Sequence, residues 1–175
     1  MRTTPRDEFS EFVAASGPAL FRVALALTGA HHAAEDLLQG VLERTFARWR
    51  HVSGDPGAYA RSALYRSQVS VWRRRAVVRE QPVSELPDRA DDRDAMHGTH
   101  LRLAVRTALA RLGPRQRAVL VARFYEDLTD EQTAELLGCA VGTVRSQTHR
   151  ALVRLRQLAP ELTDLDNDFA EEGVA

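Results

Sequence analysis

Hydroxyl, glycine and arginine side chains alternate with apolar ones along residues 141–158. If this stretch is a helix, its inward face carries the residues spaced alternately by three and four, which are Val141, Val144, Thr148, Ala151, Leu155 and Leu158. The outward side, with Arg145 on its flank, then carries Gly142, Thr143, Arg145, Ser146, His149 and Arg150. Such side chains suit phosphate oxygens and major-groove base edges, and the stretch has no carboxylate to oppose the DNA charge. The pattern predicts a DNA-binding helix, with an ordinary solvated face as the alternative.

A second group of side chains suits unpaired bases. It forms a stripe on the predicted helix that starts near Pro56, and consists of Arg61, Tyr65, Gln68 and Trp72 followed by Arg73, Arg74 and Arg75. Stacking of one base on an aromatic ring is worth about 1–3 kcal/mol, and arginines follow the phosphates. The stripe predicts a surface for single-stranded nucleic acid. In the alternative interpretation, Tyr65 and Trp72 pack against a neighbouring helix.

The polar trio Glu35, Asp36 and Gln39 contains groups that could act in acid–base chemistry. Glu35 and Asp36 are adjacent in sequence, however, so their side chains diverge on a helix. No active site follows from them. They either complement the dipole at a helix N-terminus or form a polar docking strip for another protein.

Metal and redox chemistry have little support in the sequence. The histidines, including His31, His32, His97 and His100, lack a third ligand at a useful spacing, so no metal site and no cofactor are expected. The lone Cys139 cannot form an internal disulfide and fits a small buried residue in a turn.

These side chains need helices to position them. In the first part of the chain an amphipathic pattern runs through residues 37–49, and residues 9–27 show similar spacing interrupted at Pro18, where a new helix could begin. Asp55 is a predicted N-cap, with Pro56 at the first helical position. Three or four helices are therefore expected within residues 6–75.

Residues 76–99 are rich in acids and contain two prolines, which predicts a flexible acidic linker. A second helical unit follows over residues 100–159, with a new helix starting at Gly113-Pro114. Thr129 and Gln132 form a capping-box pattern, and Gly138 is placed to end that helix in a left-handed conformation. The acidic residues 160–175 are expected to be disordered. The predicted fold is all-α, with two small helical domains and a helix-turn-helix in the second.

The composition sets only broad limits. The chain has 175 residues and a formal net charge of zero, so its overall charge names no partner. Basic and acidic stretches alternate along it, however. No apolar run looks long enough to cross a bilayer and no signal-like core follows Met1, so we expect a cytoplasmic protein without membrane insertion.

Taken in order, these segments resemble the two domains of an extracytoplasmic-function sigma factor of bacterial RNA polymerase. The resemblance rests on "AEDLLQGVLERTFARW" at residues 34–49, the arginine-tipped helix ending "VWRRR", the acidic linker and "LTDEQTAELLGCAVGTVRSQTHRALVRL". It extends over residues 9–158. It implies a factor without catalytic activity that directs promoter-specific initiation by core polymerase, with promoter DNA and an anti-sigma factor as further partners.

The resemblance also implies roles for particular residues. Asp36 and Gln39 would face the clamp coiled coil of the polymerase. The flap of the polymerase would bind the second unit. The helix from Arg61 to Arg75 would engage and open the minus-ten element. Arg145, Ser146 and Arg150 would contact the minus-thirty-five element.

Three positions depart from the family pattern. Arg66, counted here among the DNA-binding residues, stands where the family usually has asparagine, and Ser70 stands where aspartate is frequent. Ala140 replaces a common helix-capping serine, a change that should cost about 1 kcal/mol of local stability. The minus-ten preference therefore does not transfer by resemblance.

Two other classes of protein share some of these features. An autonomous repressor or activator would use the same helix-turn-helix, but a dimeric one fixes its DNA-binding units relative to each other, whereas a long linker suits two different elements read by one chain. A DNA-processing enzyme would need a nucleophilic serine or tyrosine beside a convergent basic cluster, and the sequence offers none.

Overall fold

The computed structural model describes the backbone of residues 4–77 and 100–160, and side chains within 4–71 and 104–160. In the first unit, α1 (Pro5–Thr28), α2 (His31–Ala47), a 3-10 turn (Trp49–His51) and α3 (Pro56–Val77) follow one another. The second unit contains α4 (His100–Ala110), α5 (Pro114–Leu120), a π-helical turn (Val121–Tyr125), α6 (Asp130–Leu137) and α7 (Val141–Leu158). The described ranges contain no strand, so the predicted all-α fold is confirmed. The predicted linker and tail lie outside the described residues, except for a few residues at their ends.

Helix α1 differs from the prediction, because it continues through Pro18 as a single helix. A proline inside a helix removes one backbone hydrogen bond and crowds the preceding turn. Tertiary packing holds the helix on both sides of it. Before Pro18, the ring of Phe9 lies 4.9 Å from that of Phe46 and 5.1 Å from that of Trp49, between centroids. After Pro18, α1 buries residues of the core, which are Leu20, Val23, Ala24 and Leu27.

The predicted caps are confirmed. The carboxylate of Asp55 accepts hydrogen bonds from the backbone N–H groups of Gly57 (2.8 Å) and Ala58 (3.2 Å), which begins α3. Thr129 and Gln132 form the capping box of α6, and Gly138 ends α6 with φ at 63°, the left-handed conformation that glycine adopts without strain. These local signals produce the helix-turn-helix of α6 and α7.

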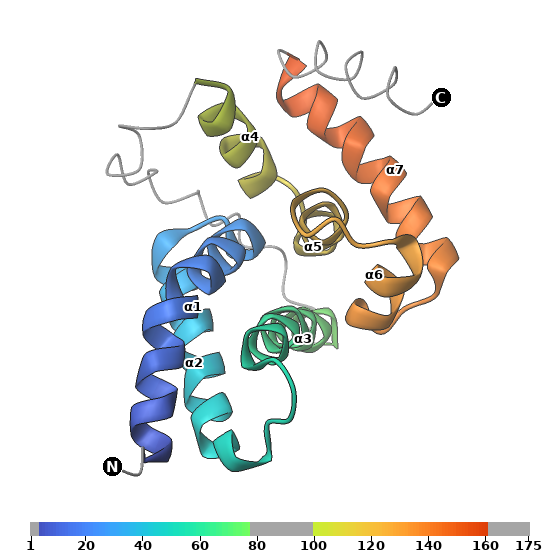
Figure 1. Cartoon of the computed structure of the whole chain (residues 1–175). Helices are drawn as coiled ribbons and strands as arrows, with labels where there is room; N and C mark the ends of the chain where they lie inside the picture. Colours follow the sequence, from blue (N-terminus) through green and yellow to red (C-terminus); the bar gives the residue numbers. More distant parts are fainter. Residues whose placement is uncertain (1–3, 78–99, 161–175) are drawn as a thin grey trace, which may run out of the picture.

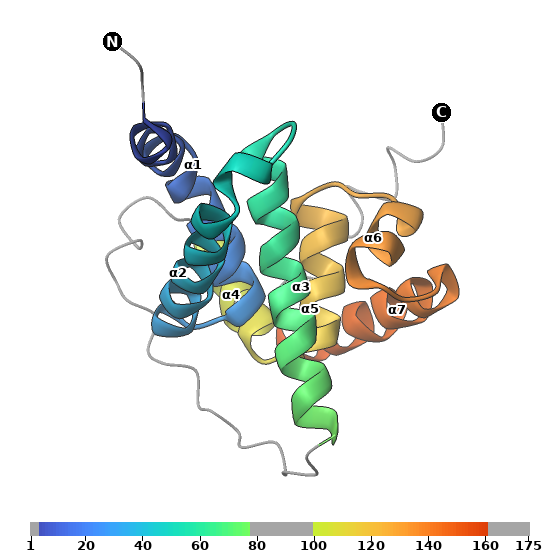
Figure 2. The same cartoon turned by 90° about the horizontal axis from the view of Figure 1, so that it is seen from below.

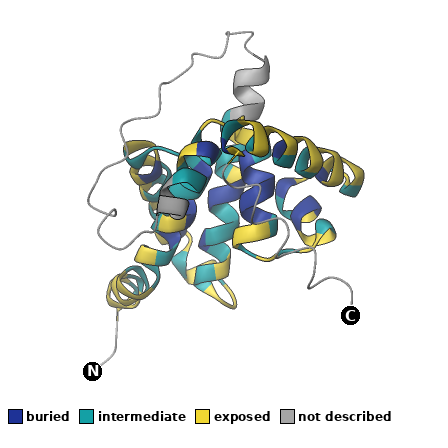
Figure 3. Cartoon of the chain, turned by 90° about the horizontal axis from the view of Figure 1, so that it is seen from above, coloured by how far each residue is buried: buried dark blue, intermediate teal, exposed yellow. Residues whose placement is uncertain are grey.

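The two units pack against each other. Helix α3 lies between α1 and α2 on one side and α5 and α6 on the other (Figures 1 and 2). Buried residues of both units form one apolar cluster, in which Leu27 and Leu64 of the first unit join Ala118, Val119 and Leu137 of the second. Figure 3 shows buried residues gathered in the helices at the centre of the molecule and exposed residues along the outer faces.

The expectation that no apolar run is long enough to cross a bilayer was wrong for α1. Among the described residues it is one helix that is long and apolar enough to cross a bilayer by length and composition alone. Core helices of globular proteins pass the same test, and here the apolar side chains of the carboxyl-terminal half of α1 contact α2 and α3. In this structure the buried part of this pattern, Leu20, Val23, Ala24 and Leu27, belongs to the core.

Candidate nucleic-acid interface

The exposed face of α7 agrees with the prediction from its spacing. Val144 and Ala151 are fully buried, and Thr148 donates its hydroxyl to the carbonyl of Val144 (2.9 Å). The predicted outward residues are all exposed, namely Gly142, Thr143, Arg145, Ser146, His149 and Arg150. Among the described residues Arg150 has no acidic partner. Hydroxyl, imidazole and guanidinium groups therefore share one solvent-facing surface, which we call the α7 face.

The expectation that no carboxylate lies near these cations was wrong for Arg145. Its Nε lies 3.0 Å from Asp130 Oδ2 and its Nη2 lies 3.9 Å from Glu131 Oε1, both on the first turn of α6. Asp130 also forms an ion pair with Arg123, whose Nε lies 2.9 Å from Asp130 Oδ1. Because the Arg145 side chain is still 67% exposed, its remaining N–H groups can reach a phosphate. The acidic pair orients Arg145 at the edge of the α7 face and partly neutralises it.

The first two residues of the predicted stripe on α3, Arg61 and Tyr65, lie against the second unit. Tyr65 is fully buried, and its hydroxyl has no hydrogen-bond partner in the described part of the chain. Burial, with the Glu126 carboxylate adding to it, raises the pKa of the Tyr65 phenol above its usual range. The Arg61 guanidinium lies 3.3 Å from Glu126 of the second unit. In this arrangement Tyr65 does not offer its ring to a base, because α3 packs it into the core.

The rest of the stripe is described in part. Gln68 donates to the carbonyl of Leu27 at 3.2 Å, which ties α3 to α1. Arg66 is exposed on the opposite side of α3 from Leu64 and Tyr65. The side chains of Trp72, Arg73, Arg74 and Arg75 lie outside the described residues.

The predicted docking strip is exposed on α2. Asp36 and Gln39 both face solvent, and Gln39 donates to Glu43 at 3.0 Å. Gln39 and Glu35 of the strip line a groove of about 540 Å³ between α1 and α2. Its apolar lining consists of Phe9, Phe21, Leu38, Leu42 and Phe46.

Phe46, an apolar residue of the amphipathic pattern over residues 37–49, is 47% exposed in the wall of this groove. The sequence signal was ambiguous, because one apolar stripe served both the core and this surface. An exposed aromatic residue beside polar groups is the usual composition of a protein-binding surface.

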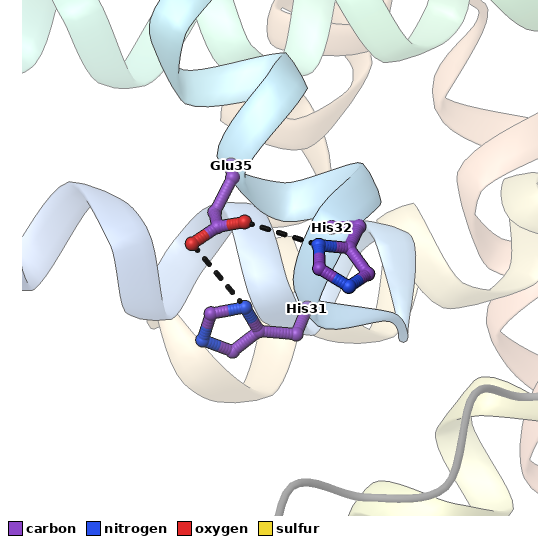
Figure 4. Close-up of side chains that lie close together, drawn as sticks. All are labelled: His31, His32 and Glu35. Carbon is purple, nitrogen blue, oxygen red and sulfur yellow. Dashed lines mark hydrogen bonds and ion pairs between the residues drawn. The ribbon is translucent and has the colours of Figure 1, made fainter.

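The structure also brings together three side chains that the sequence did not combine. Glu35 Oε1 lies 3.4 Å from His31 Nδ1, and Glu35 Oε2 lies 3.3 Å from His32 Nδ1 (Figure 4). Their candidate ligand atoms lie within 4.8 Å of one another, so the argument that a third ligand is lacking was wrong. All three occupy the start of α2, where the positive end of the helix dipole favours the carboxylate and opposes a bound cation.

Comparisons with known proteins agree with this geometry. Residues 102–155 match the family model described as "Sigma-70, region 4". The chain is 38% identical over 162 residues to the RNA polymerase sigma-E factor of Streptomyces antibioticus, covering 91% of this chain and 88% of that protein. It is 36% identical over 152 residues to the ECF RNA polymerase sigma factor SigL of Mycobacterium tuberculosis, covering 82% and 84%.

A solved structure is also similar. The sigma factor RpoE from Bartonella quintana, crystallised with the anti-sigma factor NepR, matches with a TM-score of 0.60 at 26% identity, covering 86% of this chain and 96% of that one. A helix-turn-helix with a cationic exposed face, joined to a second helical unit, defines a DNA-binding transcription factor. The chain belongs to the RNA polymerase sigma factors of the extracytoplasmic-function group.

Proposed function

We propose that this chain directs promoter-specific transcription initiation by binding core RNA polymerase and reading promoter DNA through two units, residues 6–75 and 100–159. The observation that carries the proposal is the continuous exposed α7 face in a chain that belongs to the sigma factors. The factor acts in the cytoplasm and has no catalytic activity of its own, since the chemistry of RNA synthesis belongs to the polymerase.

The α7 face is the proposed reader of the minus-thirty-five element. Arginines form bidentate hydrogen bonds to guanine edges or contact phosphates, and serine and threonine hydroxyls bond to either. Arg150 is best suited to a base, because no acidic side chain of the described residues competes for it. Arg145 is better suited to a phosphate, since Asp130 already holds its Nε.

The proposed minus-ten surface follows α3 and comprises Arg61, Arg66, Trp72, Arg73, Arg74 and Arg75. Tyr65 joins it only if the second unit moves away from α3, because the ring is buried in the packed arrangement. The arginine at position 66 adds positive charge on the exposed side of α3. This supports phosphate binding there in addition to base stacking by Trp72.

Asp36 and Gln39 are the proposed contacts to the clamp coiled coil of the polymerase, and the second unit is the proposed partner of the flap. The groove beside them supplies apolar area that a helical segment of a partner could fill. An anti-sigma factor is a further candidate partner, supported by the similar sigma factor that was crystallised with one.

In vitro transcription tests the proposal. Purified chain and bacterial core polymerase, incubated with genomic fragments from the source organism, should yield transcripts from specific start sites, whereas core alone should not. A symmetric footprint made by the chain alone, without any transcript on adding core, would instead identify an autonomous repressor or activator.

A further inference from the structure

One buried arginine joins the ends of two helices. Arg117 on α5 is only 7% exposed, and its guanidinium donates to backbone carbonyls instead of carboxylates. Within its own unit it bonds to the carbonyls of Leu109 (2.9 Å), Ala110 (2.8 Å) and Leu112 (2.9 Å), at the end of α4. Its Nη1 reaches across to the carbonyls of Leu27 (3.3 Å) and Thr28, at the end of α1.

The chemistry of this contact is favourable without a counter-ion. The last carbonyls of a helix have no partner within the helix and carry the negative end of its dipole, so a cation there is stabilising. Burial lowers the pKa of Arg117 to about 10, which leaves it charged at neutral pH. One guanidinium therefore donates hydrogen bonds to the terminal carbonyls of both α4 and α1.

A glycine at the end of α1 allows the Arg117 guanidinium to come close to the backbone. Gly29 ends α1 with φ at 79°, and a Cβ at that position would lie 2.8 Å from Arg117 Nη1 and 3.0 Å from the Cβ of Ala110. Only glycine fits that conformation without strain and leaves room for the arginine. The end of α1 and the end of α4 are therefore in close contact around Arg117.

The same docking covers one side of α3. Tyr65 is fully buried, and Arg61 is paired with Glu126 of the second unit. Further along α3, Gln68 and Val69 line a small apolar cavity of about 60 Å³ whose other walls come from α5, the α6–α7 turn and α7. A nucleic acid strand cannot reach this side of α3 while α5 and α6 lie against it.

We infer that Arg117 is an intramolecular latch that holds the second unit on α1 and thereby keeps the nucleic-acid surface of α3 closed in the free protein. The inference rests on the proposed role of α3. Opening breaks the contacts of Arg117 to α1 but keeps its contacts to α4, so the second unit can remain folded when it separates. The Leu27 carbonyl then keeps its hydrogen bond from Gln68, and the Thr28 carbonyl pairs with water.

Two substitutions test the latch from different sides. Arg117→Gln removes the guanidinium itself. Glu126→Arg leaves Arg117 in place but replaces the ion-pair partner of Arg61 with a second cation, which should repel it. The matched control is Glu135→Arg, which makes the same charge change at an exposed position of α6. The measurements are the radius of gyration from small-angle X-ray scattering and the affinity of the free chain for a fluorescent single-stranded oligonucleotide, read by anisotropy.

Arg117→Gln and Glu126→Arg should both expand the chain and tighten oligonucleotide binding by roughly 5- to 10-fold, the gain expected when an open state populated at about 10% becomes dominant. Glu135→Arg should leave the radius of gyration unchanged, and should tighten oligonucleotide binding only by the amount that the added positive charge contributes. The double variant Arg117→Gln/Glu126→Arg should bind no tighter than the better single variant, because one opening event underlies both effects.

Several results would overturn the latch. If Arg117→Gln changes neither the radius of gyration nor the oligonucleotide affinity, Arg117 does not hold the two units together. A loss of far-ultraviolet circular dichroism in Arg117→Gln would assign the arginine to holding its own unit together. Glu126→Arg indistinguishable from Glu135→Arg would show that docking does not mask α3. Transcription by wild-type holoenzyme tests the proposed function separately, and with core polymerase both opening variants should initiate as well as wild type does.

Discussion

Arg150 is the side chain on which reading of the upstream element is expected to depend most. Arg150→Ala should leave polymerase binding intact and lower selection of the matched minus-thirty-five sequence by about 1–3 kcal/mol if the guanidinium reads a base. If it contacts a phosphate, the loss should be uniform across sequences with a shallower salt dependence. Titration of open complexes on matched and mismatched promoters distinguishes the two. Arg22→Ala, which removes an exposed cation from α1, is the control.

Asp36 is expected to act at the polymerase instead of DNA. Asp36→Ala should weaken binding to core enzyme, because a polar contact at a protein interface is lost, while the α7 face stays unchanged. Pull-down with core polymerase measures the effect, and Glu11→Ala, another exposed acid of the first unit, serves as the comparison. Normal core binding by Asp36→Ala would mean that the role taken from the family resemblance is wrong.

Glu126 makes stability depend on pH. Burial raises the pKa of its carboxyl although Arg61 at 3.3 Å opposes the change, so the folded chain binds this proton more tightly than the unfolded chain does. For a carboxyl whose pKa is raised on folding, stability increases as pH falls through the folded-state value. As pH falls from 7 towards the ordinary carboxyl range, urea unfolding should therefore show a stabilising contribution in wild type that Glu126→Gln lacks. Equal pH profiles would contradict it.

The start of α7 has an unfilled capping position. Ala140 is the N-cap residue in extended conformation, with no side-chain oxygen to accept from the first turn. Ala140→Ser should stabilise the chain by about 1 kcal/mol, and Thr129→Ala, which removes the cap of α6, should destabilise it by a similar amount. Chemical denaturation measures both. An unchanged midpoint for Ala140→Ser would mean that the first turn of α7 is already satisfied by solvent.

Helix α1 shows how packing overrides a local signal. Pro18 is a helix-breaking residue by its covalent structure, yet α1 runs through it. The aromatic contacts of Phe9 and the burial of Leu20 and Leu27 hold the two halves of α1 in line. The same helix passes a membrane-span test by composition, because a helix that covers a core needs a similarly apolar sequence.

The molecule as a whole is expected to bind DNA weakly until polymerase opens it. The closed arrangement buries Tyr65 and pairs Arg61 with Glu126, while the α7 face with Arg145 and Arg150 stays exposed. Electrophoretic titration of the isolated chain on double-stranded promoter DNA should give weak, strongly salt-dependent binding, and core polymerase should supply the affinity. Tight and symmetric footprints from the chain alone would contradict this expectation.

Much of the structure followed from short-range patterns. The caps at Asp55 and Thr129, the left-handed turn at Gly138 and the inward and outward sides of α7 each depend on residues within one or two helical turns. Such signals are set by backbone geometry and helical period, so the amino-acid sequence alone determines them. The all-α class and the helix-turn-helix were predictable for this reason.

Other features required contacts between distant residues. Arg117 reaches the carbonyl of Leu27 across a separation of 90 residues, and Arg145 meets Asp130 across 15. The burial of Tyr65 likewise depends on the second unit, and no periodicity along α3 distinguishes a ring that faces solvent from one that faces another helix. The sequence alone determined the caps of α3 and α6, the turn at Gly138 and the apolar side of α7. Only the tertiary structure decided which polar and aromatic groups meet, because that depends on how two separately patterned units pack together.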